Sequence, residues 1–345
     1  MIGAQERFVL VARAVALMIL LLSPVGQVLA AGSSQRGLTI VVTFPSLYAD
    51  VRALSCDVDN VISLVPPGVD PHEFELSPGS VRELAEADVI VSTLHAPFEL
   101  QIHNLWAQGA LRATLIEIPK LGLRFFENPV TNATNYHMPV FDPFNFMIFA
   151  RALSTTLAKL NPSAASCYEQ RLLTILTNIS TIIARAPPFA CNAVGEAPFV
   201  QYSVEWAGIN VVGLIMAEEG IEAPPSILSQ YNAMAASGAL GCVVLSEPPA
   251  SPSAHDYLVR FANEYHLKAI TVPSEEANVT VVHRMELLLA QIAGQAPETS
   301  ATSPAQAGQQ QASAPWGLIS WALLVVVVIL LAYLAYSMVV AARRR

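Results

Sequence analysis

The sequence predicts an α/β fold in which two lobes, each with a mainly parallel sheet, are joined by a long rigid helix. Short runs rich in Val, Ile and Leu alternate with segments of helical periodicity, and this alternation occurs twice along the chain. The stretch between the two series has no strand pattern. A charge-free apolar segment near the C-terminus predicts one transmembrane helix in addition.

The two lobes are expected over residues 36–161 and 187–294, because each range holds one series of alternating elements. In the first, the predicted strands cover residues 38–44, 61–65, 89–92 and 115–118, and the predicted helices cover 80–87 and 98–109. In the second, the strands cover 190–195, 210–216, 242–246 and 268–272, and the helices cover 226–236, 253–265 and 279–293. Strands separated by helices usually form parallel sheets.

The connecting helix is predicted over residues 162–186. Apolar residues such as Ile175 and Ile179 recur there at helical intervals. Asn161 and Pro162 supply a capping residue and a first-turn residue at its start.

The two ends of the chain predict an exported protein tethered to the cell membrane. Residues 1–31 combine basic residues, a short apolar run and small residues suited to cleavage, which is typical of a signal peptide; an uncleaved anchor is the alternative. Residues 316–342 are long and apolar enough to span a bilayer, and the three arginines at 343–345 place the C-terminus in the cytoplasm. Residues 295–315 predict a flexible linker. The binding domain is therefore expected outside the cell.

Charge and cysteine content narrow the function classes. A net charge of -9 disfavours nucleic acid as a partner. The four cysteines show no CxxC spacing, so a thiolate zinc site is not predicted, and their three possible disulfide pairings stay open. These cysteines are Cys56, Cys167, Cys191 and Cys242. Asn-x-Ser/Thr patterns, weakly consistent with an exported glycoprotein, occur at Asn132, Asn178 and Asn278.

The GxxxxGK[ST], GxSxG and HExxH motifs are all missing from the sequence, which favours a non-enzymatic protein. The most distinctive segment instead follows the second predicted strand and reads GVDPHEFELSPGSVRELAEADVIV, with His72 in its Pro-rich loop. Loops at the carboxyl ends of parallel strands commonly bind ligands. By itself, however, a histidine in such a loop is more often structural than a ligand.

This segment resembles the metal-binding (zinc/manganese-type) solute-binding proteins of ABC transporters, in which a G-x-D-P-H-x-[YF]-E-x-x-P loop leads into a helix. In that resemblance His72 corresponds to the first metal ligand. A second family feature is a histidine shortly before Asp-Pro and a helix. The stretch NYHMPVFDP is similar to it with one extra residue, so His137 corresponds to the second ligand.

The resemblance implies two carboxylate ligands from the second lobe. The stretch GEAPFVQYSVEWAG is similar to the family segment that carries the third ligand, which makes Glu196 the expected residue and leaves Ser203 and Glu205 as alternatives. The family has an Asp as the last ligand, and this chain departs from that pattern. Glu275 is the expected replacement, with Glu276 as the alternative.

The other histidines match no ligand position of the family, and surface or packing roles are expected for them. His95 is the reserve candidate because it follows a predicted strand. Two imidazoles suit zinc, manganese and related ions. The loop at residues 123–134 lacks the His- and acid-rich composition of many zinc-type members, so the sequence does not separate Zn²⁺ from Mn²⁺.

The resemblance thus implies a protein that captures Zn²⁺ or Mn²⁺ between two lobes and delivers the ion to an ABC permease driven by a cytoplasmic ATPase, and the predicted transmembrane helix adds a membrane anchor. One alternative is a surface adhesin or structural protein with a degenerate metal site, since the family's last Asp is missing. A second alternative is a metalloenzyme that uses the same two histidines with an open coordination position.

Overall fold

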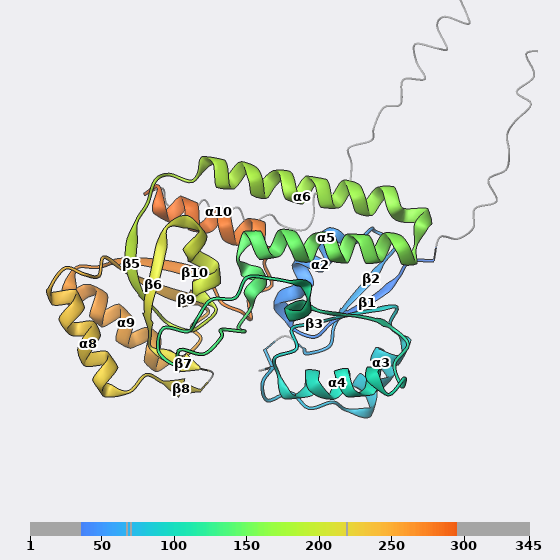
Figure 1. Ribbon diagram of the computed structural model, residues 1–345, viewed down its shortest axis with the longest axis horizontal. Helices are drawn as coiled ribbons and strands as arrows, with labels where there is room; N and C mark the ends of the chain where they lie inside the picture. The colour runs from blue at the N-terminus through green and yellow to red at the C-terminus, as the bar shows by residue number, and fades with distance from the viewer. Residues whose placement is uncertain (1–35, 67, 70, 219, 295–345) are drawn as a thin grey trace, which may run out of the picture. The chain divides into compact units, whose positions relative to one another are not determined.

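The computed structural model describes residues 36–294 except 67, 70 and 219, and it contains two four-stranded sheets (Figure 1). The first sheet has the order β2-β1-β3-β4, and all of its strands are parallel. Its strands are β1 (Thr39–Val42), β2 (Asn60–Ser63), β3 (Val89–Ser92) and β4 (Thr114–Glu117). Every residue of the central strand β3 is buried, as expected for a parallel sheet covered on both faces.

Three helices accompany this sheet, and we call the whole the first lobe. They are α2 (Tyr48–Leu54), α3 (Pro78–Glu86) and α4 (Pro97–Ala107). Both α3 and α4 begin at a proline, whose fixed φ suits the first helical turn. The Ser77 hydroxyl caps α3 by accepting a hydrogen bond from Ser80 N at 3.1 Å.

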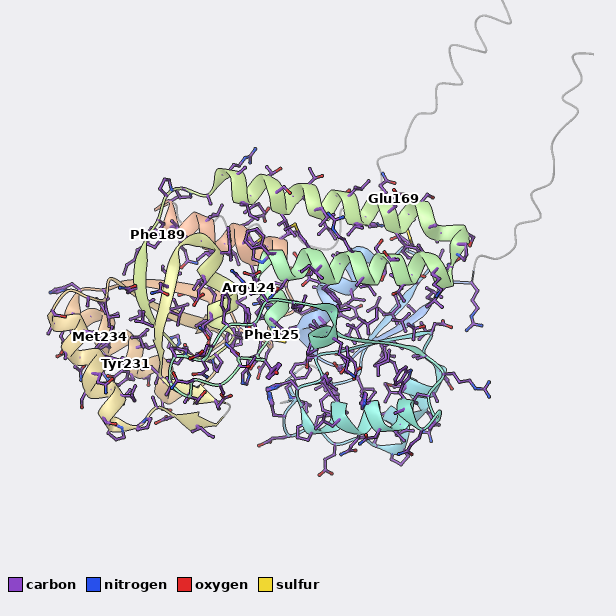
Figure 2. All side chains as sticks on the ribbon, viewed as in Figure 1. Arg124, Phe125, Glu169, Phe189, Tyr231 and Met234 are labelled. Carbon is purple, nitrogen blue, oxygen red and sulfur yellow. A yellow bond between two sulfur atoms is a disulfide. The ribbon has the colours of Figure 1, made fainter. Side chains whose placement is uncertain are left out.

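The second sheet has the order β10-β9-β5-β6 and is also entirely parallel. Its strands are β5 (Cys191–Gly195), β6 (Ile209–Leu214), β9 (Cys242–Glu247) and β10 (Lys268–Pro273). The associated helices are α7 (Val200–Val204), α8 (Pro225–Ala236), α9 (Pro252–Tyr265) and α10 (Val281–Ile292). Tyr231 of α8 (Figure 2) anchors this helix to β6, because its hydroxyl accepts a hydrogen bond from Leu214 N at 3.0 Å. We call this part the second lobe.

Two long helices lie between the two series of strands. Helix α5 (Pro143–Leu160) is followed by a single 3-10 turn at Pro162–Ala164 and then by α6 (Ala165–Arg185), and α5 packs along α6 (Figure 1). The predicted two parallel sheets and long helix are confirmed. No range was predicted for α5, which the family resemblance implied only as a helix after Asp142-Pro143. Helices α2 and α7 and the antiparallel hairpin of β7 (Met216–Glu218) and β8 (Ile221–Glu222) were not predicted either, because they are too short for a clear periodicity.

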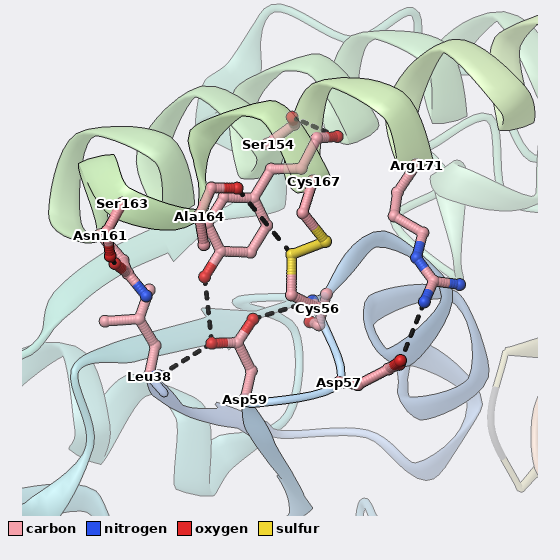
Figure 3. Close-up of a disulfide and its surroundings, with 12 residues drawn as sticks. Leu38, Cys56, Asp57, Asp59, Ser154, Asn161, Ser163, Ala164, Cys167 and Arg171 are labelled. Atoms are coloured by element: carbon pink, nitrogen blue, oxygen red, sulfur yellow. Dashed lines mark hydrogen bonds and ion pairs between the residues drawn. A yellow bond between two sulfur atoms is a disulfide. The ribbon is translucent and has the colours of Figure 1, made fainter. Parts of the chain in front are cut away.

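The four cysteines form two disulfides, one in each lobe region. Cys191 pairs with Cys242 at the starts of β5 and β9. Cys56, which follows α2, pairs with Cys167 in the first turn of α6 (Figure 3). Beside this bond the buried Asp59 carboxylate accepts hydrogen bonds from Leu38 N at 2.8 Å and Cys56 N at 2.9 Å. The Cys56–Cys167 disulfide therefore fixes the N-terminal end of α6 to the first lobe.

The lobes also meet in a polar contact between α2 and α10. Asp50 of α2 is buried and accepts a hydrogen bond from Val281 N, at the start of α10, at 3.0 Å. Arg284, one turn later, is buried too, and its guanidinium lies 3.9 Å from the centre of the Phe141 ring of the first lobe. This contact joins the last helix of the second lobe to the first lobe.

Within the described part of the chain, no helix combines the length and the apolar character needed to cross a bilayer. The predicted signal peptide, the linker and the transmembrane helix at residues 316–342 all lie outside the described residues.

Candidate metal centre

Three histidines converge at one edge of the first sheet. His72 lies in the loop after β2, His95 lies three residues after the end of β3, and His137 lies in the long connection between β4 and α5. The strands of this sheet are all parallel, so their carboxyl ends lie at the same edge and bring these loops together. This topology, more than any local spacing, assembles the site.

The three side chains form a compact cluster. One ring nitrogen of each histidine lies within 4.8 Å of one ring nitrogen of each of the other two. The ring centroids of His95 and His137 are 4.4 Å apart, and that of His72 lies 5.3 Å from His95 and 6.1 Å from His137. His137 is buried, while His72 and His95 are half-buried. Such a group of imidazole nitrogens is a suitable donor set for a divalent transition metal.

His95 owes its position to an unusual turn between β3 and α4. Leu94 has a φ of 52°, a left-handed conformation that is uncommon for a leucine. The buried Glu99 carboxylate accepts a hydrogen bond from His95 N at 2.7 Å and another from Ala96 N at 3.0 Å. The backbone on both sides of the His95 side chain is thereby held.

His137 is positioned by a contact with the second lobe. The Asn135 side chain accepts a hydrogen bond from His137 N at 2.9 Å and donates one to Pro198 O and one to Gln201 Oε1, each at 2.8 Å. Tyr202 of α7 donates a further hydrogen bond from its hydroxyl to Asn135 O at 2.5 Å. The histidine-bearing loop of the first lobe thus rests directly on α7.

Glu218 brings a carboxylate of the second lobe to the cluster. Its Oε2 lies 2.9 Å from Nε2 of His137. It stands at the end of β7, and the Asn128 side chain fixes the hairpin by donating to Ala217 O at 2.6 Å and to Glu218 Oε1 at 3.3 Å. A tetrahedral ion with bonds of about 2.0–2.1 Å needs its ligand atoms ~3.3 Å apart. The His137–Glu218 pair is therefore close to the separation that a shared ion requires.

The surroundings favour a neutral imidazole at His95 and an ionised carboxylate at Glu218, the protonation states of metal ligands. Burial, together with the smaller effects of the His137 and His72 charges, lowers the pKa of His95 to about 4 against the raising effects of the Glu99 and Glu218 charges. The hydrogen bond from His137, aided by the charges of His137 and His95, holds the pKa of Glu218 below its ordinary value against the opposing effect of burial. Both groups are thus ready to bind a cation at neutral pH.

The structure does not bring the predicted carboxylates Glu196 and Glu275 into the histidine cluster. Glu196 is fully buried after β5, and its oxygens are already engaged within the second lobe. It accepts hydrogen bonds from Ser246 N at 2.9 Å and Ala250 N at 2.7 Å, and lies 2.9 Å from Nδ1 of His255. Glu275 lies after β10, where its charge raises the pKa of Arg284 against the larger lowering effect of burial. Glu196 therefore lies in a hydrogen-bond network of the second lobe, and Glu275 lies where its charge acts on Arg284.

The alternatives considered for the third and fourth ligands are also outside the cluster. The Ser203 hydroxyl donates within α7 to Phe199 O at 3.3 Å. Burial raises the pKa of Glu205, which accepts a hydrogen bond from Gln201 at 3.4 Å. Glu276 is exposed. His95, the reserve candidate of the sequence analysis, lies in the cluster, as its place after a predicted strand suggested. Glu218, at the end of the short strand β7, was not among the predicted residues.

The low pKa of His95 predicts a pH-dependent stability of the metal-free protein. The unfolded chain binds a proton at this residue below its ordinary pKa of 6.5, whereas the folded protein does so only near 4. This contribution to the free energy of unfolding is therefore present above pH 6.5 and is lost as the pH falls toward 4. In urea unfolding with a chelator between pH 4.5 and 7, we expect His95→Gln to show a shallower rise of stability with pH than the wild type.

The control for this prediction is His283→Gln, which removes an exposed imidazole from α10. It should keep the slope of the wild type. Equal slopes for the wild type and His95→Gln would contradict the prediction.

Comparison with known proteins agrees with a metal-binding role. Residues 40–295 match the family model described as "Zinc-uptake complex component A periplasmic". Over 209 residues the chain is 42% identical to the metal ABC transporter substrate-binding lipoprotein ScbA of Streptococcus cristatus, a match that covers 53% of this chain and 63% of ScbA. The chain covers between about a fifth and just under two thirds of the lengths of the curated relatives it matches.

Solved structures of binding proteins share the fold. The Mn²⁺ complex of FpvC from Pseudomonas aeruginosa superposes with a TM-score of 0.59 at 18% identity, covering 74% of this chain and 97% of that one. The laminin-binding protein Lmb of Streptococcus agalactiae, described as having adhesin and metal-transporting activity, gives a TM-score of 0.59 at 18% identity and covers 74% of this chain and all of its own. The likeness to these structures establishes the fold.

Proposed function

Because the chain belongs to the family of the periplasmic component A of zinc-uptake complexes, we propose that it captures a divalent transition metal at the cluster of His72, His95 and His137 and passes it to an ABC importer. The observation that carries this proposal is the convergence of three imidazole nitrogens within 4.8 Å at the carboxyl edge of the first sheet. The family is one of binding components, in agreement with the prediction that the chain is not an enzyme.

Glu218 is the proposed fourth ligand. It is a carboxylate of the second lobe that touches the cluster, at 2.9 Å from His137. Three nitrogens and one oxygen complete a four-coordinate site, whereas a catalytic metal keeps one position open for water or substrate. This supports capture and release over catalysis. The residues Glu196 and Glu275, expected from the family resemblance, are the alternative carboxylates, and the experiment below distinguishes the two sets.

Zn²⁺ and Mn²⁺ are the proposed cargo. The three imidazoles favour a borderline ion such as Zn²⁺ over the harder Mn²⁺, while the carboxylate suits both. The proposed partners are a permease, which receives the ion, and the ATPase that drives it. The apolar residues 316–342 are proposed to anchor the chain in the cell membrane with the binding lobes outside; the two disulfides support this, since such bonds persist in oxidising compartments.

Metal titration of the full-length chain tests the site. We expect one Zn²⁺ per wild-type chain, measured by equilibrium dialysis and elemental analysis. His72→Ala, His95→Ala and His137→Ala should each lose about 100-fold or more in affinity, because even residues that only support ligands cost about 10–100-fold. Glu218→Gln should lose at least about tenfold.

Matched controls are His103→Ala and Glu222→Gln, which lie outside the cluster. Both should bind Zn²⁺ like the wild type, as should Glu196→Gln and Glu275→Gln. A wild-type chain that binds neither Zn²⁺ nor Mn²⁺ would exclude the uptake function and favour an adhesin or structural protein. Loss of binding in Glu196→Gln or Glu275→Gln, but not in Glu218→Gln, would restore the carboxylates expected from the resemblance.

A further inference from the structure

Glu99 is a buried carboxylate with an unusually complete set of donors. Its side chain has no exposed surface and stands in the first turn of α4. It accepts six hydrogen bonds, and four of them come from residues 93–96. The donors are Thr43 Oγ1 at 2.6 Å, Ser92 Oγ at 2.9 Å, Thr93 N at 2.6 Å, Thr93 Oγ1 at 2.5 Å, His95 N at 2.7 Å and Ala96 N at 3.0 Å.

Glu99 holds residues 93–96 in a turn whose backbone conformation is unfavourable by itself. Leu94 is in the left-handed region at a φ of 52°, which is unfavourable for a residue with a branched side chain. Hydrogen bonds from Thr93 N and His95 N to Glu99 hold the backbone at the residues before and after it. Hydrogen bonds to a buried charge are stronger than those between neutral groups, so this carboxylate can retain the strained turn.

We propose that Glu99 is the positioning residue that holds His95 in the metal centre and thereby makes the centre a three-histidine site. This inference rests on the proposed function. Glu99 acts on the backbone that carries His95, while the imidazole itself faces His137 and His72. Without the carboxylate the 93–96 turn relaxes, the third imidazole leaves the cluster, and the site retains His72 and His137.

The chemistry of the substitution Glu99→Gln makes the role testable. Oε1 accepts from Thr43, Ser92 and Thr93 N, and Oε2 accepts from Thr93 Oγ1, His95 N and Ala96 N. A glutamine has one accepting oxygen and one donating NH₂ group, so one of these two sets of donors must face another donor. Glutamine therefore keeps the size of the glutamate side chain but has one accepting oxygen in place of two.

A double-mutant cycle on Zn²⁺ affinity separates positioning from a general structural role. The full-length wild type, Glu99→Gln, His95→Ala and the double variant are titrated with Zn²⁺ against a competing chelator at pH 7.5. We expect Glu99→Gln to lose about 10–100-fold in affinity, as supporting residues of metal sites do. The double variant should bind within about twofold of His95→Ala, because a residue that acts through His95 has no effect once the imidazole is gone.

Two results would overturn the inference while leaving the proposed function intact: wild-type affinity in Glu99→Gln, or losses that multiply in the double variant. Wild-type affinity in His95→Ala would overturn it as well, by removing His95 from the site. A wild-type chain that does not bind Zn²⁺ at all would instead remove the proposed function, and the inference with it.

A milder variant and a matched control test whether the loss of Zn²⁺ affinity comes from unfolding. Thr93→Val removes one hydrogen-bond donor to Glu99 and keeps the carboxylate. A severalfold loss of Zn²⁺ affinity is expected when His95 is present, and no loss in the His95→Ala background. Asp59→Asn alters a comparable buried carboxylate of the first lobe, which accepts from Leu38 N and Cys56 N. It should lower the melting temperature without changing Zn²⁺ affinity by more than about twofold. If Asp59→Asn lost as much Zn²⁺ affinity as Glu99→Gln, general destabilisation of the first lobe would account for the effect of Glu99→Gln.

Discussion

Replacement of Arg284 by methionine is expected to lower the free energy of unfolding by about 3–5 kcal/mol, the cost of removing one partner from a buried set of charges. The Arg284 guanidinium donates hydrogen bonds to Pro273 O at 2.6 Å and to Ser274 O and Ala277 O, each at 2.9 Å. Methionine fills much of the same space but leaves these three carbonyls without the guanidinium. It also withdraws the positive charge that attracts the buried Asp50 carboxylate.

The pH dependence of this loss identifies its cause. Burial raises the pKa of Asp50 to about 7, although Val281 N–H and the Arg284 charge pull it down. A carboxyl group with a raised pKa costs stability as the pH rises from its ordinary value of 3.8 through 7, and this cost grows when Arg284 is absent. Urea unfolding should therefore show a larger effect of Arg284→Met at pH 8 than at pH 5.

The matched control is Arg260→Met on the exposed face of α9, which should change stability by less than about 0.5 kcal/mol. Adding Asp50→Asn to Arg284→Met should abolish the extra loss at pH 8, because no buried charge remains to be neutralised. An effect of Arg284→Met that is the same at both pH values would contradict the role given to Asp50.

Removal of the Cys56–Cys167 disulfide by paired alanine substitutions is expected to cost the metal-free protein about 4–5 kcal/mol. The bond closes a loop across a sequence separation of 111 residues, and the chain entropy that it removes from the unfolded state grows with loop length. The Cys191–Cys242 bond spans a separation of 51 residues, so its removal should cost slightly less, by about 0.7 kcal/mol on the same scale.

Denaturant unfolding of both paired variants, followed by circular dichroism and by fluorescence, measures these losses. The second pair serves as the control for loss of any disulfide. A loss below about 1 kcal/mol for Cys56→Ala/Cys167→Ala would show that contacts of α6 alone hold it to the first lobe. One such contact is the hydrogen bond from the Tyr168 hydroxyl to Asp59 at 3.0 Å.

The sequence predicts the sheets well because their strands are short, apolar and regularly spaced. It also leads to His72 and His137, through motifs whose residues are consecutive, and the structure places both in the cluster. The β7–β8 hairpin could not be predicted in the same way. Strands of two and three residues carry no readable period, and so Glu218 was not among the predicted ligands.

The hydrogen-bond partners of Glu196 show a different limit of prediction from sequence. Its place after β5 suits a ligand, but its oxygens are taken by Ser246, Ala250 and His255, which are 50 or more residues away in sequence. Which donors reach a buried carboxylate depends on tertiary packing, and local pattern does not record it. The same reason left the disulfide pairing open, since three connectivities fit four cysteines equally well.

The way in which the proposed ligands are held has a consequence for the release of an ion. His72 and His95 project from loops of the first sheet, whereas the loop that carries His137 is held against α7 by the hydrogen bonds of Asn135. Asn128, in the same connection, holds the β7–β8 hairpin that carries Glu218. A change in the angle between the lobes is therefore expected to move His137 together with Glu218. Under the proposed function, such a movement would release the ion by separating two pairs of ligands, His72 with His95 and His137 with Glu218.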